Sequence, residues 1–533
     1  MTDAVVTAPA AAAAPTRIPW LGLTAVLLGT FISTLNGRLS SFGLADVRGA
    51  MHAGFDEGAW ITTAQTMAQM LIAPVAIWMG TIYGPRRVLL GAALSFAVVS
   101  TLTPFSTNLP ALLALQFLGG VASGFFVPLT LSFILRSLPP KFWAYGVALY
   151  ALNLELSLNI SASLEGWYVD HLSWRWIFWQ NVPLAVGMAL CLQFGVARTP
   201  PDPNHPPADI FGLATAGVGL ALIYAALDQG NRLDWLNSGA VWGLLAAGGL
   251  LVAGFLVHEA RTAHPLINLK VAFAPPLPQL LLLIAFLRLT ILSTAYLIPQ
   301  YLQAVRGFRA LEVGQTLVWI AAPQLIFCPL AALTLRRTDA RLVASIGFIF
   351  VAIACLSVAH GLTPDWTSDQ FLPSQLLQAV GQSFALSGIL FLAVLNLRPQ
   401  DAITFGAMVQ TARLMGGEIG TAFVATLARV RGQVASNLIG LHVQSGDLAV
   451  QQRLAAYAAA TARNGADPAG PARAAGVLGA VVRSAATTQG VIDAFVAVAA
   501  LTSVALLFVV AQRPAPLGPA SHTPLFTRWG AAP

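Results

Sequence analysis

The stretch AVWGLLAAGGLLVAGFLV, residues 240–257, runs for 18 positions without a charged side chain or a proline. A helix that crosses the hydrocarbon core of a bilayer needs about 20 mainly apolar residues. Such runs recur along nearly the whole chain of 533 residues, of which 57% are hydrophobic and only 9% are charged. A typical soluble domain has roughly 25% charged residues. The sequence therefore predicts an all-helical integral membrane protein.

Fourteen apolar runs follow one another, separated by charged or Pro/Gly-rich breaks. They cover residues 19–45, 59–82, 88–104, 109–135, 142–164, 174–196, 210–227, 240–257, 277–305, 311–335, 342–359, 371–397, 402–430 and 490–511. Because they group as six, two and six, we expect two six-helix bundles and two inserted helices. The expected divisions are a disordered cytoplasmic tail at 1–18, a bundle at 19–197, an insert at 208–258, a bundle at 275–511 and a cytoplasmic tail at 512–533.

A weak internal repeat supports two related halves. The pairs Arg86-Arg87 and Arg336-Arg337 follow the second run of each six, and Gln-x-x-Gly occurs in the fourth run of each, at 116–119 and 378–381. Many secondary transporters are built from related halves that face each other across a site near the bilayer midplane. The pattern therefore favours a transporter.

The net charge of +7 comes from single basic residues between apolar runs, not from a basic stripe that could bind nucleic acid. With the N-terminus in the cytoplasm, most basic residues at the span ends lie on the cytoplasmic side, as the positive-inside rule requires. Among them are Arg86, Arg87, Arg136, Lys141, Arg336 and Arg337. We therefore expect a multi-pass protein with both termini in the cytoplasm.

The segment 431–489 is the longest one between two runs and would lie on the outer side. It is rich in Ala, and residues 450–462 have helical periodicity, with a Gly/Pro break at 465–471. Because structureless loops of this length are uncommon unless they are functional, we expect a helical hairpin that docks a partner. A flexible loop is the alternative.

Six ionisable side chains fall inside the predicted spans. They are Arg38, Glu155, Glu165, Arg288, Arg413 and Glu418. An ion at the bilayer centre costs about 2.5–3.5 kcal/mol on insertion scales, so such residues usually mark a transport pathway. Three are positive and three are negative, so static pairing inside the protein is the alternative interpretation.

The depth of these residues in the spans separates their expected roles. Glu155 lies mid-span in the polar run Asn153–Ser157, and we expect it to carry a transported proton or to form a static ion pair. Glu418, in Gly-Gly-Glu-Ile-Gly, should face another helix or the cavity, because glycines permit close helix approach. Glu165 should be a wetted residue at the outer rim, and Arg38 could reach the outer surface.

Amide side chains accompany the ions. The amides in the spans that we expect at the cavity are Asn36, Gln65, Gln69, Gln116, Gln300 and Gln378, although each glutamine could instead bond a neighbouring helix. Together with Arg288 and Arg413 they predict a cavity that suits amphiphilic molecules better than sugars or bare ions.

Several stretches resemble one family. SWRWIF at 173–178, Asn181-Val182-Pro183, PQYLQ at 299–303 and Thr411-Ala412-Arg413 with the following glycines are similar to the EmrB/QacA-type fourteen-span drug:proton antiporters of the major facilitator superfamily. The resemblance implies the major facilitator fold and proton-driven export across a bacterial inner membrane. The EmrB branch also implies docking of a periplasmic adaptor and an outer-membrane channel, which fits 431–489.

The chain departs from the family pattern at its charged positions. Of the loop motif after the second span, only Gly84, Arg86 and Arg87 remain, as gating-loop candidates. Asn36 stands at the position of the usual acid in the first span, and Gln116 at that of the fourth-span arginine. We therefore hypothesise that Glu155 takes over proton coupling and exchanges partners with Arg38, with Glu418 as a second candidate.

Other functional classes are less well supported by the sequence. No metal-ligand spacing, phosphate loop or Ser/His/Asp set occurs, so neither an enzyme nor a cofactor is expected. The cavity arginines and the degraded antiporter motif leave open an importer or uniporter of organic anions. A non-transporting membrane scaffold is the remaining alternative.

Overall fold

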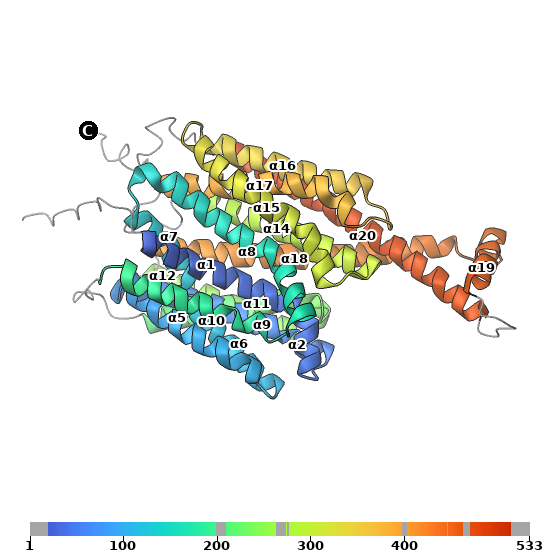
Figure 1. The fold of residues 1–533 in the computed structure, drawn as a ribbon, viewed down its shortest axis with the longest axis horizontal. Helices are drawn as coiled ribbons and strands as arrows, with labels where there is room; N and C mark the ends of the chain where they lie inside the picture. Colours follow the sequence, from blue (N-terminus) through green and yellow to red (C-terminus); the bar gives the residue numbers. More distant parts are fainter. Residues whose placement is uncertain are drawn as a thin grey trace, which may run out of the picture.

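The computed structural model describes residues 20–198, 209–262, 273, 277–396, 402–444, 446–461 and 470–512, and its regular structure there is helical. The long helices form an elongated bundle from which α18, α19 and α20 project at one end (Figure 1). We call this the α19 end, and the opposite one the terminal end. The long elements are α1 (Trp20–Phe42), α4 (Trp60–Ile82), α5 (Pro85–Leu102), α6 (Leu109–Ser123), α7 (Phe126–Ser137), α8 (Trp143–His171), α10 (Asn181–Gly195), α11 (Ile210–Gly230), α12 (Gly239–Arg261), α14 (Leu277–Arg306), α15 (Ala310–Leu335), α16 (Ala340–Gly361), α17 (Ser368–Leu395), α18 (Ala402–Leu441), α19 (Leu448–Thr461) and α20 (Gly470–Val510).

Short elements complete the described ranges. α2 (Leu44–Ala50) and α3 (Phe55–Gly58) connect α1 to α4, and α9 (Trp176–Trp179) precedes α10. The 3-10 helices are η1 (Thr103–Phe105), η2 (Pro140–Phe142) and η3 (Trp235–Asn237). The predicted tails lie outside the described residues, apart from Gln512.

Each predicted span corresponds to one helix or, for the fourth and sixth, to two consecutive helices. Among the described helices, twelve are long and apolar enough to cross a membrane. α4 and α18 are not among the twelve. Their sequences carry Gln65 and Gln69, and Gln410, Arg413 and Glu418, respectively. Because several of these side chains line a central cavity, the low hydropathy of these two helices itself indicates the position of a polar site.

Helix starts follow local capping chemistry. The Asn108 and Asp209 side chains accept hydrogen bonds from the backbone N–H groups of Ala111 and Gly212, both at 2.9 Å. Before α5, Gly84 adopts a φ of 78° and a ψ of 151°, a conformation essentially restricted to glycine. The sharp turn between α4 and α5 therefore depends on this glycine.

Helices from the two halves of the chain interlock. α8 packs along α15 and also contacts α17, while α18 packs against α7 and α4. The inserted pair lies beside this junction: α11 packs on α4 and contacts α18, and α12 packs on α11. The insert therefore contributes one helix to the centre of the molecule.

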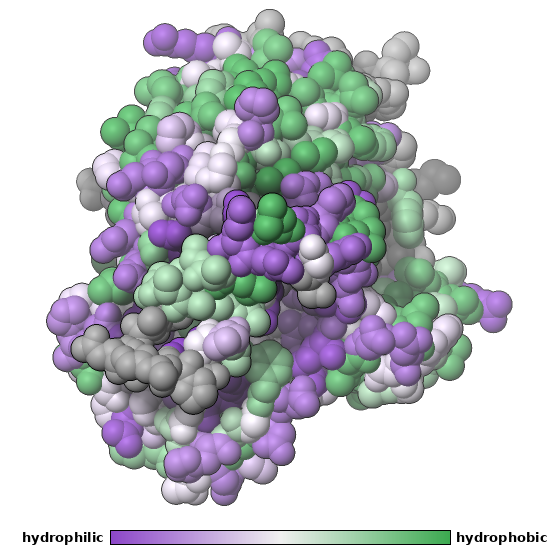
Figure 2. Space-filling model, turned by 90° about the vertical axis from the view of Figure 1, so that its right-hand side faces the viewer, coloured by the Kyte–Doolittle hydropathy of each residue, from purple (hydrophilic) through white to green (hydrophobic). Residues whose placement is uncertain are grey.

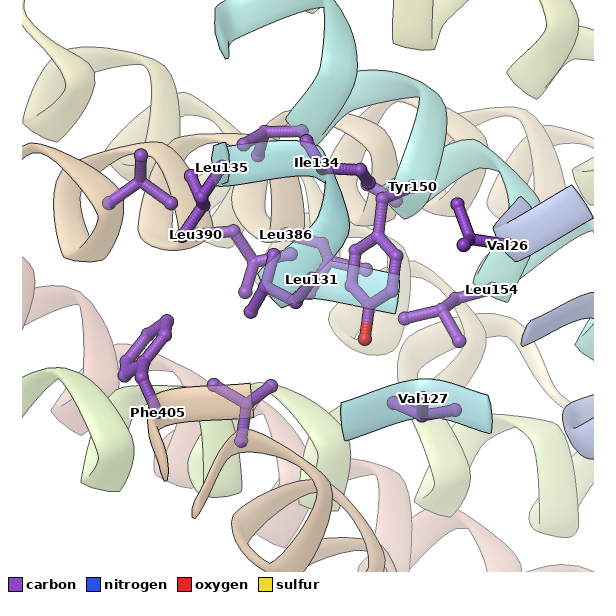
Figure 3. Packing of buried hydrophobic residues seen from close by; sticks show 14 of the residues in the cluster. Val26, Val127, Leu131, Ile134, Leu135, Tyr150, Leu154, Leu386, Leu390 and Phe405 are labelled. Carbon is purple, nitrogen blue, oxygen red and sulfur yellow. The ribbon is translucent and has the colours of Figure 1, made fainter. Parts of the chain in front are cut away.

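An apolar plug closes the terminal end of the bundle. Its residues come from helices in both halves of the chain and interdigitate in one cluster (Figure 3). Labelled members are Val26, Val127, Leu131, Ile134, Leu135, Tyr150, Leu154, Leu386, Leu390 and Phe405. All ten are buried, so the plug is a close-packed apolar layer among the described residues.

The segment 431–489 is helical over most of its described length. α18 continues to Leu441, α19 follows, and α20 begins at Gly470, well before the predicted last span. Arg431 on α18 forms an ion pair with Asp493 on α20, which ties the two projecting helices together. Residues 445 and 462–469, which include most of the predicted Gly/Pro break, lie outside the described residues.

Candidate functional site

A polar cavity of about 510 Å³ lies between α1, α4, α8, α11, α14 and α18. Its lining comes from the middle of the bundle and from the helix halves nearer the α19 end, including Phe55 and Arg232. Seen from that end, hydrophilic residues gather around a recess near the middle of the face (Figure 2). Together with the plug on the other side, this geometry is a bundle that is open at the α19 end and closed at the terminal end.

A buried ion pair lies at the floor of the cavity. Arg288 on α14 donates a hydrogen bond of 2.9 Å from Nη1 to Oε1 of Glu155 on α8, and their side chains are 3% and 0% exposed. Oε2 of Glu155 has no hydrogen-bond partner among the described residues. Since Arg288 lines the cavity and Glu155 lies behind it, the pair joins the two halves of the chain at the point where the cavity ends.

This pairing differs from the partner expected for Glu155. Arg38 lines the cavity but lies over the ring of Phe42, with its guanidinium carbon 5.1 Å from the ring centre, and bonds the carbonyl of Ala295 at 3.4 Å. In this conformation the carboxylate of Glu155 is therefore held by Arg288 and not by Arg38. Hydropathy predicts both arginines inside spans, but it does not indicate which of the two helices lies against the carboxylate of Glu155.

A second arginine, Arg413 on α18, adds positive charge to the same floor. Its Nε and Nη2 donate to Oε1 of Gln410 at 3.2 and 2.8 Å, and it interacts electrostatically with both Arg288 and Glu155. Two guanidinium groups thus surround one buried carboxylate. Such a cluster can attract an anionic group into the cavity. Its electrostatic energy also changes strongly when its one acid, Glu155, is protonated.

An acidic cluster forms the side wall contributed by the insert. The Tyr224 hydroxyl on α11 donates to Oε2 of Glu418 on α18 at 3.0 Å. One turn away, Asp228 accepts hydrogen bonds from the Thr63 hydroxyl and, at 3.0 Å, from the side-chain amide of Gln229. The prediction that Glu418 faces another helix or the cavity is correct in both respects, because Glu418 lines the cavity.

Tyr224 and Asp228 were not expected at the site. Hydropathy predicts the end of the seventh apolar run at residue 227 and Asp228 in a loop, whereas α11 continues to Gly230. Helical spacing could have placed Asp228 at the site together with Tyr224, because the two are four residues apart and share one helix face.

The predicted cavity amides separate into three groups. Gln69 lines the cavity and donates to Ser123 at 3.1 Å. Asn36, Gln65, Gln116 and Gln378 are buried between helices and are not part of its lining; Asn36, for example, accepts from Asn181 at 2.6 Å. Gln300 is exposed on α14 and is not part of the lining of this cavity.

The expectation for Glu165 was also wrong. Its side chain is completely buried near Gly43 and Ile177, and both carboxylate oxygens have no hydrogen-bond partner among the described residues. Gly43, just before α2, and Ile177 on α9 lie close to this end of α8, which a span assignment from hydropathy does not show.

The gating-loop candidates occupy the terminal end. Arg86 donates to the carbonyls of Leu192 and Gln193 at 3.3 and 2.9 Å and so fixes the α4–α5 turn to the end of α10. Arg87 is exposed. In the second half, Arg336 donates to the Tyr145 hydroxyl at 2.6 Å, which links α15 to α8 beside the plug.

Solved structures share this fold. The xylose symporter XylE superposes with a TM-score of 0.59 at 11% identity, covering 96% of this chain and 99% of that one. The human organic anion transporter MFSD10 superposes with a TM-score of 0.57 at 15% identity, covering 93% and 100%. At these identities the likeness concerns the fold alone.

Sequence relatives agree with the predicted resemblance. The multidrug export protein EmrB of Haemophilus influenzae is 23% identical over 419 residues, covering 79% of this chain and 82% of the relative. The probable multidrug resistance protein EmrY of Escherichia coli is 25% identical, covering 76% and 80%. The fatty acid resistance protein FarB of Neisseria gonorrhoeae is 22% identical, covering 77% and 80%.

The family model for the Major Facilitator Superfamily matches residues 26–421, which include all residues that line the cavity except Ala422 and Ala425. The expectation of an EmrB-type membrane transporter rather than an enzyme is thereby confirmed. The chain belongs to the Major Facilitator Superfamily.

Proposed function

We propose that the protein exports small amphiphilic or hydrophobic compounds in exchange for protons. The observation that carries the proposal is the Glu155–Arg288 pair, which is buried between the two halves at the closed end of the cavity. A single carboxylate in that position can take up a proton from the cavity or release one into it. Because its partner Arg288 lies on the other half, the change in charge also affects how the two halves pack. The names of the multidrug export relatives support the direction of transport.

The steps follow from the contacts around Glu155. When Glu155 is ionised it holds Arg288, and α8 and α14 are joined. Oε2 of Glu155 has no hydrogen-bond partner among the described residues. Protonation of this oxygen neutralises the carboxylate and removes its attraction for Arg288. The contact that joins α8 to α14 at the closed end of the cavity is then weakened, so the two halves can repack. In the proposed antiport cycle this change on proton arrival at Glu155 accompanies substrate release at the α19 end.

The acidic cluster supplies a second proton site in this scheme. Glu418 and Asp228 face the same cavity from α18 and α11, and each is held by a hydroxyl donor. Two carboxylates that share one cavity wall disfavour simultaneous ionisation, so one proton can be retained there. Asp228 therefore joins Glu155 and Glu418 as a coupling candidate.

We place the protein in the bacterial inner membrane with both termini in the cytoplasm, so that the α19 end faces the periplasm. The basic residues at the terminal end, including Arg86, Arg87 and Arg336, support this orientation. The helical projection within 431–489 would then contact a periplasmic adaptor protein and an outer-membrane channel. We retain the division into bundles at 19–197 and 275–511 and an insert at 208–258.

Removing residues 446–461 tests the docking part of this proposal. We expect export in isolated vesicles to persist, because within the described residues α19 packs chiefly on α20 and does not line the cavity. Drug resistance in whole cells should fall if docking requires α19. Unchanged resistance in cells that contain the deleted protein would rule out this docking role.

An importer or uniporter of organic anions is the second candidate function. The observation in its favour is the cationic floor, where Arg288 and Arg413 flank one carboxylate. The two functions differ in their response to a proton gradient. In acidified inside-out vesicles, an antiporter releases protons when a lipophilic drug or weak acid is added. An anion uniporter moves the compound down its own gradient with no proton release.

A further inference from the structure

A second, apolar cavity of about 300 Å³ lies on the terminal side of the polar cavity. It is enclosed by α4, α11, α12, α14 and α18, so the inserted pair forms one of its walls. Among its lining side chains only Thr411 carries a polar group; the rest are hydrophobic residues such as Ile77, Leu220, Val252 and Met408. This cavity cannot satisfy a polar ligand, because it offers almost no hydrogen-bonding groups.

The cavity opens beside the lipid-facing helix of the insert. Leu256, at its edge, is 40% exposed on α12, and Leu250 and Trp242 on the same helix are also exposed. Among the described helices, α12 packs mainly on α11. A molecule in the hydrocarbon core of the bilayer therefore has direct access to this opening.

The two cavities are stacked along the same helices. On α11, Leu220 lines the apolar cavity and Tyr224 lines the polar one, four residues or about 5–6 Å apart. On α18, Ala412 lines the apolar cavity and the adjacent Arg413 lines the polar one. An alkyl chain bound in the apolar cavity would therefore bring the end nearer the polar cavity close to its charged groups.

A small cluster of flexible side chains separates them. Its buried centre is Met70, Ala221 and Tyr224, and packed around them are Met67, Leu71, Leu220, Leu414 and Met415. Methionine is unbranched and flexible and adapts to irregular surfaces. The three methionines therefore give this partition side chains that can adjust to a passing molecule.

The volume limits what the apolar cavity can hold. An apolar cavity of about 150 Å³ binds one benzene molecule, so 300 Å³ accommodates roughly a dozen carbon atoms. This matches a single alkyl chain and is too small for both acyl chains of a phospholipid. Continuity with the charged cavity also favours a molecule with one tail and one polar head.

We propose that the apolar cavity between the insert and α4, α14 and α18 binds the alkyl chain of a single-tailed amphiphilic substrate taken from the bilayer. Passage past the Met/Leu partition then brings the head group to the polar cavity. The inference rests on the proposed export function and assigns the inserted helices a role in it: they build the hydrocarbon site.

The direct test is photo-crosslinking of the full-length protein in lipid nanodiscs. One probe is a free C16 fatty acid that carries a diazirine in its chain, and the other is a phosphatidylcholine with the same acyl chain. We expect the fatty acid to label peptides of α11, α12 and α18 around Leu220, Val252 and Met408. Equal labelling by the phosphatidylcholine, or no labelling of these peptides by either probe, would overturn the proposal.

Val252→Trp fills the cavity from α12, the helix with the least packing to lose. We expect fatty-acid labelling to fall about tenfold or more, equivalent to at least about 1.4 kcal/mol of binding. Ala246→Trp, on an exposed part of the same helix, is the matched control and should label as wild type. Ala216→Leu, which enlarges a lining residue on α11 more gently, should reduce labelling in the same direction.

A transport readout separates this site from the export function itself. With short- and long-chain carboxylates as substrates, Val252→Trp should lose the proton release caused by the long chains and keep that caused by compact compounds. If wild type releases no protons with any compound, the export proposal fails while the labelling result still stands. If Val252→Trp affects compact and long-chain compounds equally, the alkyl site is not part of the substrate path.

Discussion

Replacing Glu155 by glutamine breaks the buried pair without changing its shape. The variant leaves Arg288 charged at a position where its side chain is 3% exposed and its former partner lies 2.9 Å away. Removing one member of a buried ion pair typically destabilises a protein by about 3–5 kcal/mol, because the remaining charge is uncompensated. Arg413, which interacts with both partners, increases the imbalance of positive charge.

A double-mutant cycle measures this energy. We expect Glu155→Gln and Arg288→Met each to lower the free energy of unfolding by about 3–5 kcal/mol. The double variant should lose less than the sum, by roughly 1–3 kcal/mol. The assay is SDS titration of the purified protein in mixed micelles. Asp365→Asn, in an exposed pair whose atoms lie 3.9 Å apart, is the control and should cost under about 1 kcal/mol. Single variants with wild-type stability and an additive double variant would refute the reasoning.

Three further predictions concern other parts of the structure. Asp228→Asn and Glu418→Gln should each reduce substrate-triggered proton release, measured in vesicles, whereas full release in both variants would remove the acidic cluster from the coupling path. Gly84→Ala should destabilise the protein by about 1–3 kcal/mol, because φ is 78° there. Gly91→Ala, mid-helix with open space around it, is the control and should be neutral or stabilising. Equal effects of the two substitutions in a denaturation assay would contradict the role of the Gly84 backbone conformation. Tyr145→Phe removes the 2.6 Å hydrogen bond from Arg336. In a variant without native cysteines that carries Ser387→Cys in the plug region, we expect this change to make the thiol react about fivefold faster with a reagent from the terminal side. An unchanged rate would show that this hydrogen bond does not help close that end.

The sequence was sufficient for the fold because bilayer thickness imposes one length on every span. Runs such as 240–257 contain no charged residue or proline. The predicted spans agree with the helices to within a few residues except at the ends of the fifth and thirteenth spans and at the start of the last one. The start of α20 was missed because Ala-rich helix outside a membrane has no sustained apolar run. The low hydropathy of α4 and α18 could have been interpreted as a sign of the cavity wall.

The site was predictable only in part, because periodicity gives the faces of a helix and not its neighbours. Glu155, Arg288, Arg413 and Glu418 were identified from the cost of placing ions in a membrane, and the structure places all four at or directly behind the cavity. The partner of Glu155 required the relative positions of α8 and α14. Asp228 was lost to an error of three residues in a boundary.

The central claim is that Glu155 carries the transported proton. The most direct measurement is proton release from acidified inside-out vesicles when a panel of lipophilic drugs and weak acids is added. Wild type is compared with Glu155→Gln at matched protein content, and with Glu165→Gln as a control at a buried acid outside the cavity. The account predicts release by wild type and by Glu165→Gln, and none by Glu155→Gln. Release at the wild-type rate from Glu155→Gln would contradict it.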